Sequence, residues 1–139
     1  MTKDEISNSE LIKKAETRLF KEAQKTITQE EIKRWKLSKD QEELWRVSGR
    51  LALQLHNEKP IYIPREHPIV TQLILEAHEN CGHFGTAYTL TAFRERFSID
   101  KSRSHVKRIL KEQCYKCRRY RTNKFALPAM DPLSEERKR

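Results

Sequence analysis

The feature that most constrains this chain is a set of four metal-binding side chains arranged as two closely spaced pairs. His78-x4-His83 is followed, after thirty residues, by Cys114-x2-Cys117. Two imidazoles and two thiolates are a tetrahedral donor set that suits Zn²⁺. Either pair alone is a weak signal, but both pairs joined by a helical insert predict one structural zinc ion. Because four protein ligands leave no open position for a catalytic water, the predicted site is not catalytic.

The composition indicates why such a chain needs a metal. Of its 139 residues 36% are hydrophobic and 35% charged, so the core must be thin. Small cores of this kind often depend on a metal or on disulfides. No apolar run approaches the length of a membrane span, and the N-terminus is charged rather than signal-like. We therefore expect an intracellular protein with no membrane partner and no small-molecule substrate, whose three cysteines are thiols or metal ligands.

Alternative assignments remain open at the metal site. Cys81 lies between the histidines and is able to replace either one, although the wider separation of His78 and His83 favours the histidine pair. The Cys-x2-Cys pair also has the form of a redox motif. Redox motifs, however, open a helix after a strand, whereas this pair follows a predicted helix. We expect the two other histidines that lack a partner pair to be structural or solvent-facing: His67 and His105.

Hydrophobic periodicity predicts a mainly α-helical chain. Helices are expected at 9–27, 28–37, 68–82, 86–97 and 102–113. Thr28 and Glu31 have the spacing of a capping box at the start of the second helix. Two β-prone runs, 44–51 and 60–64, are expected to pair as a small antiparallel ribbon. The fold class is thus a small zinc-stabilised three-helix bundle of helix-turn-helix type, preceded by a short β-ribbon and an N-terminal amphipathic helix.

Apolar stripes on the predicted helices define the expected buried faces. The first helix is expected to pack on the rest of the chain or on another copy through one stripe: Leu11, Ile12, Ala15, Leu19, Ala23 and Ile27. The last two helices are expected to bury a further set: Tyr88, Leu90, Thr91, Phe97, Val106, Ile109 and Leu110.

These elements divide the chain into four predicted segments. An N-terminal helical extension spans 1–36, and a short β-ribbon and linker segment spans 37–66. The His2Cys2 zinc-binding helical domain spans 67–125, and a basic, polar tail spans 126–139.

The net charge of +9 is concentrated near the cysteines. Residues 1–45 carry ten basic and ten acidic residues, whereas 101–126 carry ten basic residues and a single acidic one. Since such a cationic stretch neutralises phosphates and releases counterions, it favours DNA, or RNA, as a partner over a merely solvated helix face. The predicted nucleic-acid contacts are Lys101, Arg103, Lys107, Arg108, Lys111, Arg118, Arg119, Arg121 and Lys124. Within this stretch, Tyr115 and Tyr120 either stack on bases or belong to the core.

Several sequence landmarks follow one another in fixed order. They are Leu44-Trp-Arg-Val-Ser-Gly-Arg-Leu51, Pro64-Arg-Glu-His-Pro68, His83-Phe-Gly85, Arg94-x-Arg-Phe97, Cys114-Tyr-Lys-Cys-Arg118 and Leu127-Pro128. Together they resemble the zinc-binding N-terminal domain of retroviral and retrotransposon integrases, the His-His-Cys-Cys domain, with most similarity to integrases of Bel/Pao-type retrotransposons. The resemblance covers roughly residues 37–133. Two departures stand out: Ser98 replaces the family's tryptophan, and Gln41-Glu42-Glu43 lacks its glycine.

The resemblance implies a nuclear role in DNA integration. Domains of this family help to assemble the integrase multimer and to hold element DNA ends. Integrases carry their strand-transfer chemistry in a following RNase H-like domain, and this chain stops at Arg139. We therefore expect no enzymatic activity from the chain by itself. A fragment of a retroelement polyprotein and a domesticated host adaptor that binds other proteins both remain open.

Overall fold

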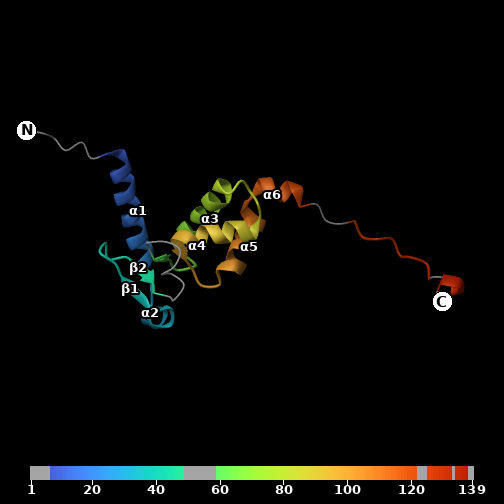
Figure 1. Cartoon of the computed structure of the whole chain (residues 1–139), viewed down its shortest axis with the longest axis horizontal. Helices are drawn as coiled ribbons and strands as arrows, with labels where there is room; N and C mark the ends of the chain where they lie inside the picture. The colour runs from blue at the N-terminus through green and yellow to red at the C-terminus, as the bar shows by residue number, and fades with distance from the viewer. Residues whose placement is uncertain (1–6, 49–58, 122–124, 133, 138–139) are drawn as a thin grey trace, which may run out of the picture.

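The computed structural model describes residues 7–48, 59–121, 125–132 and 134–137. Within these residues the chain is mainly helical with a small sheet (Figure 1). The helices are α1 (Asn8–Gln24), α2 (Gln29–Trp35), α3 (Pro68–Asn80), α4 (Thr86–Arg96), α5 (Ser102–Gln113) and α6 (Tyr115–Tyr120), followed by a 3₁₀ helix at Glu135–Arg137. The strands are β1 (Leu37–Lys39), β2 (Trp45–Val47), β3 (Ile61–Tyr62) and β4 (Phe97–Ser98).

The four strands form one sheet in the order β1-β2-β3-β4. The predicted ribbon is confirmed, because β2 and β3 pair antiparallel with Arg46 opposite Ile61. Sequence reasoning missed the outer strands: β1 pairs antiparallel with β2, and β4 pairs parallel with β3. The parallel pair places α3 and α4 in the connection between β3 and β4. The part of the first landmark beyond Ser48 lies outside the described residues.

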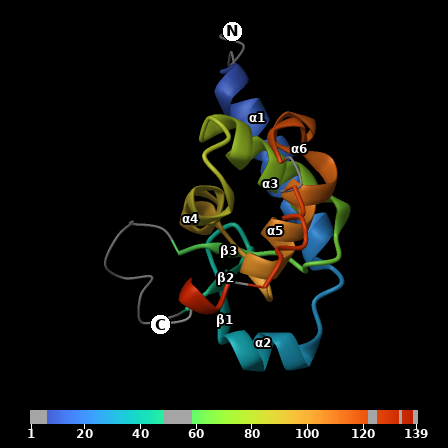
Figure 2. The same cartoon turned by 90° about the vertical axis from the view of Figure 1, so that its right-hand side faces the viewer.

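Among the described residues, one hydrophobic cluster of buried side chains joins α1, the sheet and the helices α3, α4 and α5. Figure 2 labels the elements that contribute to it. The helix α3 contributes Val70 and Ile74, and α5 contributes the three residues predicted from its stripe. In α4, Leu90 is buried as predicted, but Tyr88 and Thr91 are exposed, so that part of the prediction was wrong. Tyr88 instead lies beside the exposed ring of Phe84, with 5.9 Å between ring centroids.

The first helix reaches the core only through its last turns. Phe20, Ala23 and Gln24 are buried, whereas residues 8–15 are all exposed. Four members of the predicted stripe are therefore exposed in the described part of the chain: Ala15, and Leu11, Ile12 and Leu19, which are 49%, 60% and 56% exposed. The buried face is rotated away from that stripe because the sheet contacts the side of α1 that carries Gln24.

Gln24 ties α1 to the sheet through three hydrogen bonds. Its Nε2 donates to the carbonyl oxygens of Trp45 (3.0 Å) and Tyr62 (2.7 Å). Its Oε1 accepts from the Trp45 N–H at 2.9 Å. A buried glutamine is thus satisfied by backbone groups of two strands, which fixes the position of α1 on β2 and β3.

Local capping explains where the next helices begin. The predicted capping box of α2 is confirmed: the Glu31 N–H donates to Thr28 Oγ1 at 3.3 Å, and the Thr28 N–H donates to the Glu31 carboxylate at 2.9 Å. At α3, the ring Nδ1 of His67 accepts from the Ile69 N–H at 3.3 Å, and Pro68 occupies the first turn. His67 is therefore structural, in agreement with one of its two expected roles.

The turn between β1 and β2 holds a residue with a side chain in a left-handed conformation. Glu43 has a φ of +61°, a left-handed conformation that glycine adopts without strain. The Asp40 carboxylate compensates by accepting the N–H groups of Glu42 (2.8 Å) and Leu44 (3.0 Å), and it pairs with Arg46. These bonds lower the pKa of Asp40 against the opposing effect of its burial.

Beyond α6 the described residues run away from the helical body and are exposed throughout (Figure 1). None of the helices in the described ranges is long and apolar enough to cross a membrane.

Replacing Gln24 by Met is expected to destabilise the chain by about 2–3 kcal/mol, because two buried carbonyls and one N–H lose their partner. Urea unfolding of the zinc-loaded protein measures the effect. Gln29→Met is the matched control, since Gln29 is exposed; it is expected to change stability by less than about 0.5 kcal/mol. Equal stabilities of the two variants would contradict this role of Gln24.

Candidate metal centre

The end of α3 brings its two histidines together through a Schellman turn. The His83 N–H donates to the His78 carbonyl (3.1 Å), and the Gly82 N–H donates to the Glu79 carbonyl (2.9 Å). Gly82 has the left-handed φ of +66° that this turn requires. The ring centroids of His78 and His83 consequently lie 4.5 Å apart. The four-residue spacing in the sequence is thus the spacing of one helix terminus.

The two cysteines come from the junction of α5 and α6. Cys114, with φ −87° and ψ 98°, breaks the helical path and serves both as the C-cap of α5 and as the N-cap of α6. The Arg118 N–H then donates to the Cys114 carbonyl at 3.0 Å, which places Cys117 one turn along on the same side. Sequence reasoning predicted no helix beyond residue 113 and so missed the short helix α6.

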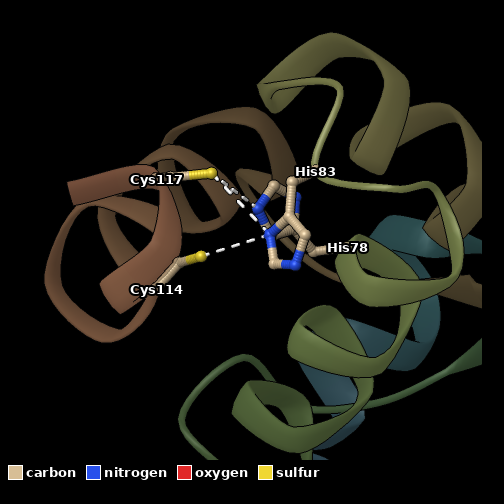
Figure 3. Close-up of side chains that lie close together, drawn as sticks. All are labelled: His78, His83, Cys114 and Cys117. Carbon is tan, nitrogen blue, oxygen red and sulfur yellow. Dashed lines mark hydrogen bonds between the residues drawn. The ribbon is translucent and has the colours of Figure 1, made fainter. Parts of the chain in front are cut away.

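The four donor atoms converge on one point (Figure 3). His78 Nε2 lies 3.1 Å from Cys117 Sγ. His83 Nδ1 lies 3.4 Å from Cys114 Sγ and 3.8 Å from Cys117 Sγ. All four donor atoms are within 4.8 Å of one another. A tetrahedral zinc ion with these ligands has edges of about 3.3–3.8 Å, so the separations fit such an ion.

A hydrogen-bond chain selects the tautomer of His78. The Thr89 hydroxyl donates to the Gly85 carbonyl at 2.8 Å, so its oxygen is left to accept from His78 Nδ1, also at 2.8 Å. With the proton held on Nδ1, the lone pair of Nε2 points at the other donors. Thr89 is completely buried in α4. Sequence reasoning missed this residue, for which the only signal was a hydroxyl on the inward face of a helix.

Electrostatics keeps the imidazole of His78 ready to bind a metal. Burial, aided by the positive charges of His83 and Arg121, lowers the pKa of His78, so its neutral form persists. Burial and the hydrogen bond with Cys114 raise the pKa of the Cys117 thiol. A divalent cation lowers the pKa of a thiol that coordinates it, so the thiol binds the metal as a thiolate.

The remaining predicted site residues have distinct locations. Cys81 is the C-cap of α3 and is not a member of the four-residue cluster. His105 is buried, with Arg108 Nη2 at 3.2 Å from its Nδ1. Of the expected nucleic-acid residues, Lys124 lies outside the described ranges. The others are all exposed: Lys101, Arg103, Lys107, Arg108, Lys111, Arg118, Arg119 and Arg121.

In a comparison with known protein families, residues 66–123 match the family model of the integrase zinc binding domain. No curated protein and no solved structure matches the chain. The matched domain is a non-catalytic, zinc-binding one. The match contains all four converging side chains, so the centre is a site for one structural zinc ion, as the sequence predicted.

Thr89→Val is expected to weaken zinc binding about 10–100-fold, because it removes the acceptor that fixes the His78 tautomer. Competition with a chromophoric chelator measures the affinity. Thr91→Val is the control: its hydroxyl bonds only to the Ala87 carbonyl of the same exposed helix face, at 3.1 Å. Equal affinities of the two variants would exclude a metal-supporting role for Thr89.

Gly82→Ala is expected to destabilise the zinc-loaded protein by about 1–2 kcal/mol, because an L-residue with a side chain is strained at this positive φ. Gly82→Asn is expected to cost less, since asparagine tolerates the left-handed conformation. Urea unfolding of both variants gives the comparison. Should alanine prove as stable as asparagine here, the Schellman turn would not limit the geometry of the histidine pair.

Proposed function

We propose that this chain is the non-catalytic zinc-binding domain of a retroelement integrase, of the Bel/Pao type, that contributes to DNA binding and multimer assembly during integration in the nucleus. The observation that carries the proposal is the four-donor site inside the segment that matches the integrase zinc binding domain. In this proposal His78 binds zinc through Nε2, His83 through Nδ1, and both cysteines through Sγ. The zinc stabilises α3, α4 and α5 as a three-helix unit of helix-turn-helix type within the segment 67–125.

The two-sided character of α5 supports a nucleic-acid role. One side is buried in the core, through Ser102, His105, Val106, Ile109 and Leu110. The basic residues of α5 stand on the other side, and those of α6 continue the exposed cationic surface past the zinc site. None of these basic residues forms an ion pair with a carboxylate in the described part of the chain. Their charges are therefore free to neutralise phosphates.

Two tyrosines add a surface for bases. Tyr115 is 78% exposed and Tyr120 is 87% exposed, so neither belongs to the core. Both lie in α6 among basic side chains. Aromatic rings in a cationic groove stack on unpaired bases with little sequence preference. We assign this role to the two tyrosines and a positioning role on phosphates to the surrounding cations.

The closed metal site supports a structural role for zinc. All four tetrahedral positions are filled by protein donors, so no position remains for a metal-bound water. The chain's part in integration is in this proposal one of binding and assembly, and strand transfer belongs to the parent integrase.

An exposed apolar stripe on α1 favours a second candidate function. Leu11, Ile12 and Leu19 are each about half exposed or more. Such a stripe suits contact with another protein chain, as expected of a domesticated host adaptor or of self-association within an integrase multimer. Light scattering over a range of protein concentrations, with and without DNA, distinguishes the integrase role from the adaptor role. DNA-dependent growth in mass supports the integrase role, and assembly indifferent to DNA supports the adaptor.

Replacing both Arg118 and Arg119 by Ala is expected to weaken DNA binding and to flatten its salt dependence. The slope of log K against log salt should fall by about 0.9 for each duplex phosphate that the variant no longer neutralises. Fluorescence anisotropy with a labelled duplex at several salt concentrations measures it.

The matched control removes two positive charges elsewhere, by Lys13→Ala and Lys14→Ala on the exposed start of α1. This control should leave the slope unchanged. If the slopes of both double variants fall equally, binding reflects net charge alone. An unchanged slope for the arginine variant would remove α6 from the DNA-binding surface.

A further inference from the structure

A pocket of about 360 Å³ opens where the start of α5 meets α4 and the end of α2. Three basic side chains line it, and no carboxylate does. The walls between them include the hydroxyls of Ser102 and Ser104 and the indole of Trp35. The basic residues are Arg94, Lys101 and Arg103.

The charges of this pocket are not neutralised by the protein. Asp100 and Glu95 adjoin the basic residues in sequence, but neither lines the pocket. Within the described ranges, none of the three basic side chains forms an ion pair. Three unpaired cations around one cavity repel one another, and a bound anion relieves that repulsion.

Arg94 is held in place at the pocket wall. Its Nε and Nη2 both donate to Ser102 Oγ, at 3.3 Å and 2.8 Å. A guanidinium carries five N–H donors, so about three remain for a ligand. Ser102 is only 8% exposed, and because its oxygen accepts from Arg94 its own O–H is left to donate.

The start of α5 adds backbone donors. The N-cap is Lys101, with a φ of +49°, and it gives no side-chain hydrogen bond to the helix. No acidic residue stands in the first turn. The first N–H groups of the helix therefore have no intrahelical acceptor, and they carry the positive end of its dipole. An anion in the pocket would satisfy these N–H groups.

We propose that this pocket binds one phosphate group of a nucleic-acid backbone. The proposal rests on the proposed DNA-binding function and deepens it. It adds Arg94 and Ser102 to a surface otherwise composed of flexible exposed side chains. Because Arg94 is fixed by Ser102 and the backbone donors are rigid, this phosphate is held at a defined position. The other cations of α5 and α6 then contact the backbone on either side.

The test uses the zinc-loaded chain and two probes. Inorganic phosphate is titrated at constant ionic strength while the backbone amides of residues 102–104 are followed by NMR. Saturable shifts are expected, and the variant Arg94→Gln with Arg103→Gln should weaken phosphate binding at least about fivefold, because it removes two charged hydrogen-bond donors. Lys21→Gln, on an exposed position of α1 outside the pocket, is the control and should bind phosphate as the wild type does.

The second probe is labelled DNA over a series of salt concentrations. The pocket variant should lower the salt slope by about 1, equivalent to one phosphate, and the control should not. If the pocket variant and the Lys21→Gln control both bind DNA with the wild-type salt slope, the pocket proposal is overturned and the proposed function stands. If the wild type binds no DNA, the proposed function fails; saturable phosphate shifts that depend on Arg94 would then assign the pocket to a smaller phosphorylated ligand. Linear phosphate shifts that are equal in all variants would exclude a phosphate site.

Discussion

The convergence of two imidazoles and two thiolates on one metal ion is the interaction on which the rest of this fold depends. It joins the last turn of α3 to the junction of α5 and α6, two places that are far apart in the sequence. The hydrophobic cluster that packs these helices is small, and α6 contributes no buried residue to it. A structural zinc ion supplies apparent binding energy on the order of 10 kcal/mol, which is comparable to the stability of a whole small domain. Zinc therefore determines whether the basic face of α5 and α6 is presented as one surface.

The parts of this structure that follow from local rules could be predicted from sequence. The histidine spacing encodes a helix terminus, the two His and Cys pairs together encode the metal site, and the Thr28 capping box encodes the start of α2. The parts that depend on distant partners could not be predicted. Thr89 acquires its role only because α4 lies against His78, and β4 exists only because α3 and α4 return the chain to β3. For the same reason the stripe, of which Ala23 is buried, did not reveal Gln24: this side chain is inward because three backbone groups of the sheet meet it there.

Two local features near the sheet and the pocket have physical explanations. Glu43 takes a left-handed conformation that the Asp40 turn stabilises. Half-buried Ser98 lines the pocket at the start of α5. A small side chain at this position leaves open space beside Arg94 and Lys101. The small side chain of Ser98 thus adjoins a pocket that three basic residues and no carboxylate line.

The most direct test of the central role of zinc is metal analysis combined with hydrogen exchange, before and after chelation, on the wild-type chain. The account predicts one zinc ion per chain, and it predicts that chelation abolishes the exchange protection of α3, α5 and α6. Returning zinc to the chelated protein should restore that protection. A purified chain without zinc, or protection in these three helices that survives chelation, would contradict the account.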